Sequence, residues 1–544
     1  MDPSNLQAFN ERLNQWIAQQ GFWFQLRYSM SAGGGFSTLL YHAMRIAFRL
    51  FLVVCVIAAG FGYFLIKRVQ KPAFKSWMTT ELAQQVGASG ARIDGFSRTQ
   101  GQLDIRRLAC IGGPDAFFTK LDAYNVRCRM GLLDSFTGVW QAGPLAARQL
   151  VIEVKAGADD PDLAARAGKA LFRDYPTFDF PSVESGDATI RWGYSPRTFG
   201  SIEHSRFHAQ RTDGAWHFQF SGGTFSQNWL QGLEIEELKA VCDASGFRIE
   251  KGILRSGEGT VILEGVSVTG GEQPVLKGTL QMTRVPLESI LPKRLQGLME
   301  GTISGRFKLG GSTNSSDGVA FTGDVTLGPE DSIILRDRLY LLRALQVVDG
   351  GVNGYRKVQF REGSFSLRSG ADKLEVEHVN LKAGDVMTLE GAFRVRPPTQ
   401  AEVNAAVNLR GGDELAPLFS KEGVAEEASQ DEITIQKAAE ASGRSVKAPA
   451  VGENEFFESF AFFDRERELQ LRIAEMQMKS LRYHGGFRVT LPSSAFVRAP
   501  ELRAAYPPDP ATDRISLNVP IKGSIDEITL LQSQELYEKG RRAE

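Results

Sequence analysis

The stretch LKGTLQMTRVPLESILPKRLQGLMEGTISGRFKLGGS, residues 276–312, decides the fold. Apolar and polar residues alternate at both of its ends, and this period of two is typical of β-strands. Between these ends, VPLESILPKRLQGL (285–298) has a proline near its start and predicts a short helix. Because residues two apart in a strand share a sheet face, the alternation predicts a sheet with one apolar face.

A small motif recurs in these strands: an apolar residue, any residue, glycine, any residue, and a second apolar residue. The glycine then lies on the apolar face between two apolar side chains. Glycine weakens a strand interior, so its recurrence predicts bends, bulges or the close approach of another backbone or a ligand. The glycines are Gly278, Gly301, Gly323, Gly391 and Gly523, with Gly265 in an imperfect copy. The apolar residues that we expect to line the face are Leu263, Leu276, Leu280, Met299, Ile303, Phe321, Val325, Leu389 and Phe393.

The same alternation extends outward along the chain. It starts near residue 88, is almost unbroken over 183–410, and returns at 469–473, 486–491 and 515–530. Residues 160–174 predict a helix, because an aspartate precedes an alanine-rich run that Pro176 ends. We therefore expect a mainly β protein whose long antiparallel sheet curls into an apolar groove, with a few short helices.

Composition shifts divide the chain into six parts. Residues 411–454 are acidic, rich in Ala and Ser and weakly apolar, which predicts a flexible linker or insertion. The charged tail 532–544 is expected to fray. The parts are an amphipathic cytoplasmic arm (1–44), a transmembrane anchor (45–70), an N-terminal β region (71–182), the β-groove (183–410), the linker (411–454) and C-terminal strands with the tail (455–544).

The anchor rests on Leu50–Ile66, LFLVVCVIAAGFGYFLI, which is 17 residues without a charge. Starting at Ile46, the helix would be roughly 31 Å long, enough to cross a ~30 Å hydrocarbon core. No small-residue cleavage site precedes the basic KRVQK that follows, so we do not expect a secretory signal peptide. Flanking charges slightly favour a cytoplasmic C-terminal side, but long domains translocate largely regardless of charge. We expect one span, with the bulk of the chain outside the cytoplasm.

The arm before the anchor is amphipathic. Leu6, Phe9, Leu13, Trp16 and Ile17 follow helical spacing, and further aromatic residues crowd positions 22–28. Two interpretations stay open, a helix lying on the membrane surface and a helix that docks a partner.

Composition and motifs argue against catalysis. The 63 basic and 64 acidic residues leave a net charge of −1, which offers no footprint for nucleic acid. No nucleotide-binding, hydrolase or zinc-protease motif is present, and only His204 and His208, near Glu203 and His217, have metal-like spacing. We interpret these as outward-facing strand residues and expect no metal, cofactor or catalytic site. The cysteines, Cys55, Cys110, Cys128 and Cys242, form no C-x-x-C pair; a Cys110–Cys128 disulfide stays open, with free buried thiols favoured.

A resemblance emerges from four stretches of the chain: RIDGFSRTQGQLDIRRLACIGG, PSVESGDATIRWG, the opening stretch 276–312, and FREGSFSLRSGADKLEVEHVNLKAGDVMTLEGAFRV. With a single N-terminal anchor, these patterns of strands and glycines resemble the AsmA-like proteins of the bacterial envelope over roughly residues 45–410 and 521–530. The resemblance implies an inner-membrane protein whose bulk lies in the periplasm. It also implies a β-groove that carries phospholipid between the envelope membranes or supports outer-membrane assembly, with envelope proteins as partners.

An alternative is a non-catalytic scaffold, in which the apolar face is a closed core and the outer surface docks envelope proteins. An enzyme whose site leaves no sequence signature is the third interpretation.

Overall fold

The computed structural model describes residues 3–31, 36–69, 71–131, 140–141, 143–155, 178–193, 199–227, 230–243, 245–269, 274–291, 293–313, 319–370, 373–399, 468, 480–525 and 527–540. The chain forms two compact units. The first comprises Met1–Phe74 with Gly131–Gly138, and the second comprises Lys75–Met130 with Val139–Glu544.

The first unit contains three helices, α1 (Pro3–Gln19), α2 (Phe22–Ser31) and α3 (Phe36–Val69). Within α3, Ala43–Val69 is long and apolar enough to cross a membrane, and it alone meets that criterion among the described helices. The apolar side chains of this stretch are mostly exposed, as the lipid-facing residues of a lone span would be. The expected single N-terminal anchor is therefore consistent with the structure.

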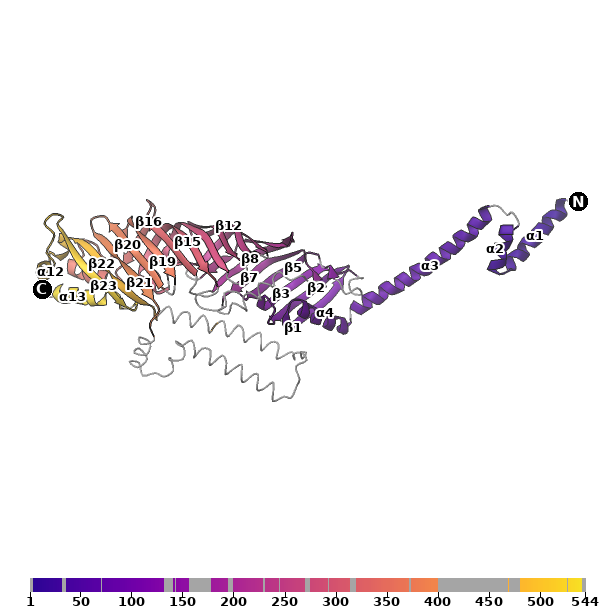
Figure 1. Ribbon diagram of the computed structural model, residues 1–544, viewed down its shortest axis with the longest axis horizontal. Helices are drawn as coiled ribbons and strands as arrows, with labels where there is room; N and C mark the ends of the chain where they lie inside the picture. The colour runs from indigo at the N-terminus through magenta and orange to yellow at the C-terminus, as the bar shows by residue number, and fades with distance from the viewer. Residues whose placement is uncertain are drawn as a thin grey trace, which may run out of the picture. The chain divides into compact units, whose positions relative to one another are not determined.

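The second unit is built on one large sheet (Figure 1). Its first strands are β1 (Ala88–Thr99), β2 (Gln102–Gly112), β3 (Phe118–Arg129), β5 (Leu145–Val154), β7 (Ser182–Trp192), β8 (Gly200–Thr212), β9 (Ala215–Ser221), β10 (Thr224–Gln227) and β11 (Leu230–Asp243). The next are β12 (Gly246–Ser256), β13 (Gly259–Thr269), β14 (Val275–Pro286), β15 (Met299–Ser312), β16 (Val319–Thr326) and β17 (Ser332–Arg336). The last are β18 (Lys357–Phe360), β19 (Glu362–Gly370), β20 (Lys373–Ala383), β21 (Met387–Arg396), β22 (Arg482–Pro492) and β23 (Arg514–Gly523). The short strands β4 (Trp140–Gln141) and β6 (Phe178–Asp179) pair with each other in parallel.

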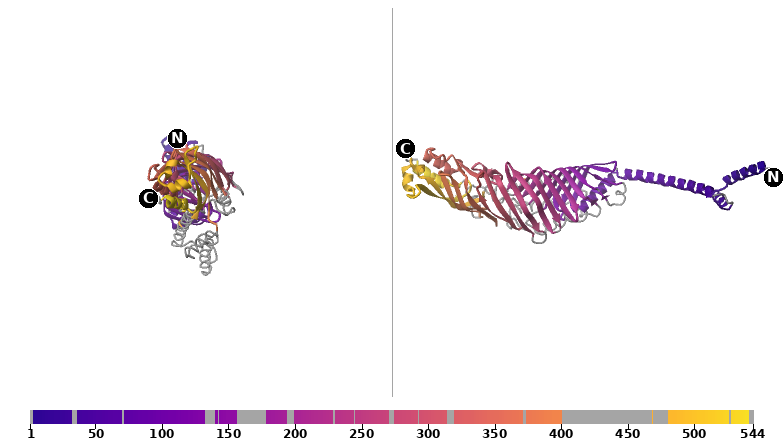
Figure 2. Two further views of the ribbon diagram at one scale, coloured as in Figure 1. Left: turned by 90° about the vertical axis from the view of Figure 1, so that its left-hand side faces the viewer. Right: turned by 90° about the horizontal axis from the view of Figure 1, so that it is seen from above.

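The strands follow one another across the sheet in chain order, as their colours show (Figure 2). Every pairing between the described strands of this sheet is antiparallel except β5–β7. Two positions in the sheet hold a broken strand. Both β9 and β10 lie between β8 and β11, and both β16 and β17 pair with β15. Counting β18 and β19 as one further position, the described residues give the sheet eighteen strand positions, of which β1 is the first and β23 the last. At ~4.8 Å per position they extend roughly 80 Å.

Register shifts mark β-bulges at several of the strand pairings, and five of these bulges share one geometry. At each of the five, the residues on the apolar face are three apart instead of two, and the residue before the second has a positive φ. An extra residue in one strand sharpens the local bend and twist, so the bulges supply the curvature that a long sheet needs. The bulge residues are His204 (φ 55°), Gly232 (φ 65°), Gly265 (φ 60°), Arg284 (φ 52°) and His378 (φ 53°).

Short helices accompany the sheet. They are α4 (Pro72–Gln85), η1 (Leu287–Ser289), α7 (Lys293–Gln296), α8 (Tyr340–Asp349), η3 (Ser493–Phe496), α12 (Pro500–Ala505) and α13 (Leu530–Gly540). The starts of α8 and α13 meet where the Leu341 amide donates to Thr529 Oγ1 at 3.3 Å, and the end of α13 lies against Val348. The two helices thus pack side by side and parallel.

Two sequence expectations are wrong here. The strand pattern was expected to be almost unbroken over 183–410, but α8 interrupts it, with Leu341, Leu342 and Leu345 buried. The strand expected to run to Leu530 ends at Gly523, and the tail expected to fray forms α13, with Leu536 buried. Both helices are held by packing on each other, which neither segment reveals alone.

Other expectations are confirmed or fall outside the described residues. A mainly β fold with one N-terminal apolar helix is observed, and the helix expected over 285–298 is present as η1 and α7. The helix expected over 160–174, the linker 411–454 and the strand near 469–473 lie outside the described residues.

The cysteines of the β-sheet are free thiols. Cys110 pairs with Leu121, whereas Cys128 lies opposite Leu103, seven residues away from Cys110 along β2. At ~3.4 Å per residue the two cysteines are roughly 24 Å apart, far beyond the reach of a disulfide. The disulfide left open by the sequence is excluded by the register of β2 and β3.

The bulge at His204 makes a test of the fold. A β-branched residue with positive φ is strained, whereas glycine adopts this conformation freely. We expect His204→Val to lower the free energy of unfolding by about 1–2 kcal/mol relative to His204→Gly. Both variants lose the contact of His204 with Asp187, so thermal unfolding of the pair isolates the backbone effect. Equal stability of the two variants would show that the bulge conformation is not maintained.

Candidate functional site

The apolar face of the sheet carries one unbroken row of residues across all eighteen strand positions, which we call the central lane. Cross-strand pairs connect each member to the next, and the flanking pairs Tyr124↔Gln149 and Arg127↔Ala146 place Val126 beside Ala147. The central lane is Phe96, Ile105, Val126, Ala147, Ser185, Phe207, Phe220, Leu238, Gly252, Leu263, Leu280, Phe307, Gly323, Leu367, Val376, Phe393, Gly485 and Ile521. Ser185 is its one polar side chain.

Glycines in the central lane make room for large neighbours. A Cβ on Gly252 would lie 2.8 Å from Leu263 Cβ, and one on Gly323 would meet the Phe307 ring. At Gly485 a Cβ would lie 2.5 Å from Phe393 Cα. Each glycine therefore pairs with a bulky residue on the adjacent strand, which keeps the lane apolar and closely packed.

The nine residues expected from the sequence to line the face all lie on it. Leu263, Leu280 and Phe393 belong to the central lane. Ile303 and Val325 are buried beside it, whereas Leu276 and Phe321 are half-buried. Met299 and Leu389 are also half-buried.

The motif glycines do not share one role: the bulges and close backbone approaches predicted from the sequence both occur, but the expected position on the apolar face is wrong for Gly265. Gly278, Gly323 and Gly391 lie on the apolar face, where a Cβ would meet Val266, Phe307 and Phe487 respectively. Gly265 instead forms an exposed bulge with nothing near its missing Cβ. Gly301 (φ 118°) lies against the Ser332 carbonyl, and Gly523 (φ 107°) lies against Glu527 at the end of β23.

Exposure varies across the apolar face from one margin to the other. At one margin Ile333, Phe360, Leu491 and Ile515 are buried. At the other, a cross-strand row that we call the open rim is half-buried apart from buried Cys242, and Phe247 is 37% exposed. The open rim is Trp216, Cys242, Phe247, Val268, Leu276, Gly311 and Val319. Solvent thus reaches the apolar face along the open rim.

The electrostatics of this face fit an apolar interior. Burial raises the pKa of Cys242 to about 11 and that of Tyr483 to about 12, because the charged forms lose their hydration. The opposite face is polar and carries cross-strand ion pairs such as Arg306–Glu264 (3.2 Å) and Arg394–Glu375 (2.7 Å). The sheet is therefore one-sided, with an apolar face and a polar, hydrated face.

The histidines singled out by their spacing lie on the hydrated face. His204 Nδ1 is 3.1 Å from Asp187, and His208 Nδ1 is 3.3 Å from Glu184. His204 owes its position to a bulge, a role that its spacing to His208 did not reveal. Among the described residues, no three His, Cys, Asp or Glu side chains gather in a way that could hold a metal ion.

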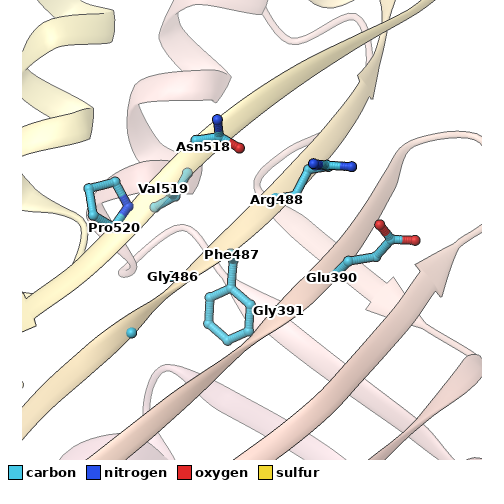
Figure 3. Close-up of a pocket in the computed structure, with 9 residues that line it drawn as sticks. Glu390, Gly391, Gly486, Phe487, Arg488, Asn518, Val519 and Pro520 are labelled. Carbon is cyan, nitrogen blue, oxygen red and sulfur yellow. The ribbon is translucent and has the colours of Figure 1, made fainter.

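A shallow hollow of about 550 Å³ lies over β21, β22 and β23. Gly391, Gly485 and Gly486 leave backbone bare there, and Glu390, Arg488 and Asn518 lie side by side across the three strands (Figure 3). These three side chains give the edge of the hollow one carboxylate, one guanidinium and one amide. The lining includes no nucleophile with an adjacent base. Sequence reasoning found Gly391 but missed the rest of this hollow.

Comparison of the chain with family models, with curated proteins and with solved structures found no match.

The pairing of Gly323 with Phe307 predicts a sharp difference between two glycines. A Cβ at Gly323 meets the buried Phe307 ring and the Arg306 carbonyl, so we expect Gly323→Ala to destabilise the protein by about 1–3 kcal/mol. Gly310, on the neighbouring strand β15, has only Leu276 O at 3.9 Å, so Gly310→Ala should leave stability nearly unchanged. Denaturant unfolding of both variants measures the difference. A Gly323→Ala protein as stable as the Gly310→Ala control would contradict the packing described for the central lane.

Proposed function

We propose that this protein is anchored in the bacterial inner membrane by α3 and that its sheet handles phospholipid in the periplasm. In this proposal the apolar face holds acyl chains during transfer between the envelope membranes or during outer-membrane assembly. The observation that carries the proposal is the central lane, a continuous row across eighteen strand positions in which Ser185 is the one polar side chain.

The size of the hydrophobic effect supports a continuous lining. Each methylene removed from water contributes ~0.8 kcal/mol, so exposing an acyl chain of about sixteen carbons to water costs on the order of 10 kcal/mol of free energy. A gap in the lining would expose part of the acyl chain to water and create a free-energy barrier to its movement at that point. The central lane has a single hydroxyl, Ser185, and its backbone amides and carbonyls are used within the sheet, which suits contact with lipid tails.

The open rim provides access to this face. Seven adjacent residues of the open rim continue from β9 to β16, and six of them are half-buried or exposed. A lipid tail lying along the open rim would contact Trp216, Phe247 and Leu276 without displacing the buried central lane. We therefore expect lipid to enter the face along the open rim and to continue over half-buried residues farther along the face, such as Phe321 and Phe393.

Chemistry at the site favours binding over catalysis. The apolar face presents aliphatic and aromatic side chains and glycines, and the hollow over β21–β23 has no nucleophile and base in its lining. The proposal therefore needs no cofactor or metal. Orientation in the membrane and the partners at the outer membrane are part of the proposal and rest on the resemblance of the sequence to AsmA-like proteins.

A second function is favoured by a specific observation. Most residues of the central lane are buried, as in an ordinary closed core. An envelope scaffold that docks other proteins through its hydrated face would need only such a closed core, without any lipid on the apolar face. The two functions differ in whether lipid contacts the open rim.

Photo-crosslinking tests the proposal at two pairs of adjacent residues. Phe321 and Phe393 are half-buried on the apolar face, whereas Thr322 and Ala392 are exposed on the opposite face. We expect benzoylphenylalanine at 321 or 393 to form phospholipid adducts in cells after irradiation, because those side chains would face the acyl chains. The same residue at 322 or 392 should form none. Mass spectrometry of the purified protein identifies the adducts.

Adducts at neither 321 nor 393, in protein that is folded and membrane-anchored, would rule out lipid on this face and leave the scaffold. Adducts at one position alone would limit the protein to a local lipid site and contradict a continuous path.

A further inference from the structure

Aromatic side chains crowd the exposed surface of α1 and α2. Phe9 is 64% exposed, Trp16 is 51% exposed and Trp23 is 78% exposed. Leu6, Phe22 and Phe24 are also exposed. Large apolar side chains gathered in one short segment mark a surface that is covered by something else.

The large apolar residues of α1 form one stripe. At ~100° per residue, Leu6, Phe9, Leu13 and Trp16 fall within about 80° of the helix circumference. Glu11 and Gln15 lie on the far side. Arg12 flanks the stripe, where a long basic side chain can extend toward water or lipid headgroups.

Contacts between the two helices extend this stripe into α2. The rings of Trp16 and Phe24 meet edge to face with centroids 5.4 Å apart. Gln25 Nε2 donates to the Ala18 carbonyl at 3.0 Å and to the Gln20 carbonyl at 2.7 Å, so it satisfies acceptors left free at the end of α1. The two helices form a hairpin whose aromatic surface is continuous.

The chain keeps this hairpin close to the membrane. α2 ends at Ser31 and α3 begins at Phe36, so five Cα–Cα steps of at most ~3.6 Å allow roughly 18 Å between them. The candidate span begins at Ala43, about 10 Å of helix beyond Phe36. The connection is long enough to bring α2 back to the surface from which α3 emerges, and too short to take it far away.

We infer that the α1–α2 hairpin lies on the lipid surface at the N-terminal end of the span, with its aromatic stripe in the interface. Tryptophan and phenylalanine are suited to the boundary between headgroups and acyl chains, and Arg12 and Arg27 suit anionic headgroups. The hairpin thereby fixes the depth and tilt of α3 from one side of the bilayer. This inference concerns the first unit and does not depend on the proposed role of the sheet.

Fluorophore labelling tests the inference in the full-length chain. We would replace Cys55 by alanine, introduce a cysteine by Phe9→Cys or by Gln15→Cys as the matched control, and attach an environment-sensitive fluorophore. Cys110, Cys128 and Cys242 are buried and should not react in the folded protein. Each protein is placed, one chain per disc, in nanodiscs of phosphatidylethanolamine and phosphatidylglycerol. Far-UV circular dichroism confirms that both variants keep their fold.

We expect the label at position 9 to be quenched by nitroxide lipids and to be several-fold less accessible to aqueous iodide than the label at position 15. Equal iodide quenching at both positions would overturn the inference, because the stripe would then face water. Protection of position 9 from iodide without quenching by nitroxide lipids would also overturn it, because protein rather than lipid would then cover the stripe.

Discussion

The architecture depends on a single register being kept through the whole sheet. Side chains alternate between faces, so a slip of one residue at any pairing would turn the following strand's apolar set into water. The central lane shows that no such slip occurs between β1 and β23, although bulges add residues at several pairings. At five of these bulges the spacing of face residues changes from two to three, as from Leu263 to Val266 and from Val376 to Val379. The bend and the sequence pattern therefore change together, and the apolar face stays on one side.

Glycine placement follows from the same continuity. A row made only of leucine and phenylalanine would overfill a closely packed face, and overpacking costs stability. The lane places glycine next to its bulkier members, with Gly323 beside Phe307 and Gly485 beside Phe393. The motif therefore recurs in the sequence partly because a glycine on one strand makes room for a bulky side chain on the adjacent strand. Where the glycine has φ near 60° and faces open space, as at Gly265, it forms a bulge instead.

The sequence predicted the parts of the fold that local periodicity determines. Alternation located most of the strands, and the uncharged run Leu50–Ile66 located the candidate span. It could not locate α8 or α13, because their buried sides, including Leu345 and Leu536, are defined by contact with each other across almost 200 residues. It placed the nine lining residues on one face but could not rank them by exposure, which depends on how the sheet curves. It predicted that His204 is an outward-facing strand residue, but the spacing of His204 and His208 could not reveal the left-handed backbone conformation at His204.

The gradient of exposure across the apolar face bears directly on the choice between a closed core and a lipid path. Residues of the buried margin, such as Phe360 and Leu491, stabilise the fold, and a lipid could take their place only by opening the sheet. Residues of the open rim already contact solvent, so lipid there would replace water rather than protein. A path along the open rim would therefore gain the free energy of burying acyl chains without a loss of packing in the central lane. On this view the central lane is the wall of the path, and the same register that stabilises the sheet keeps that wall continuous.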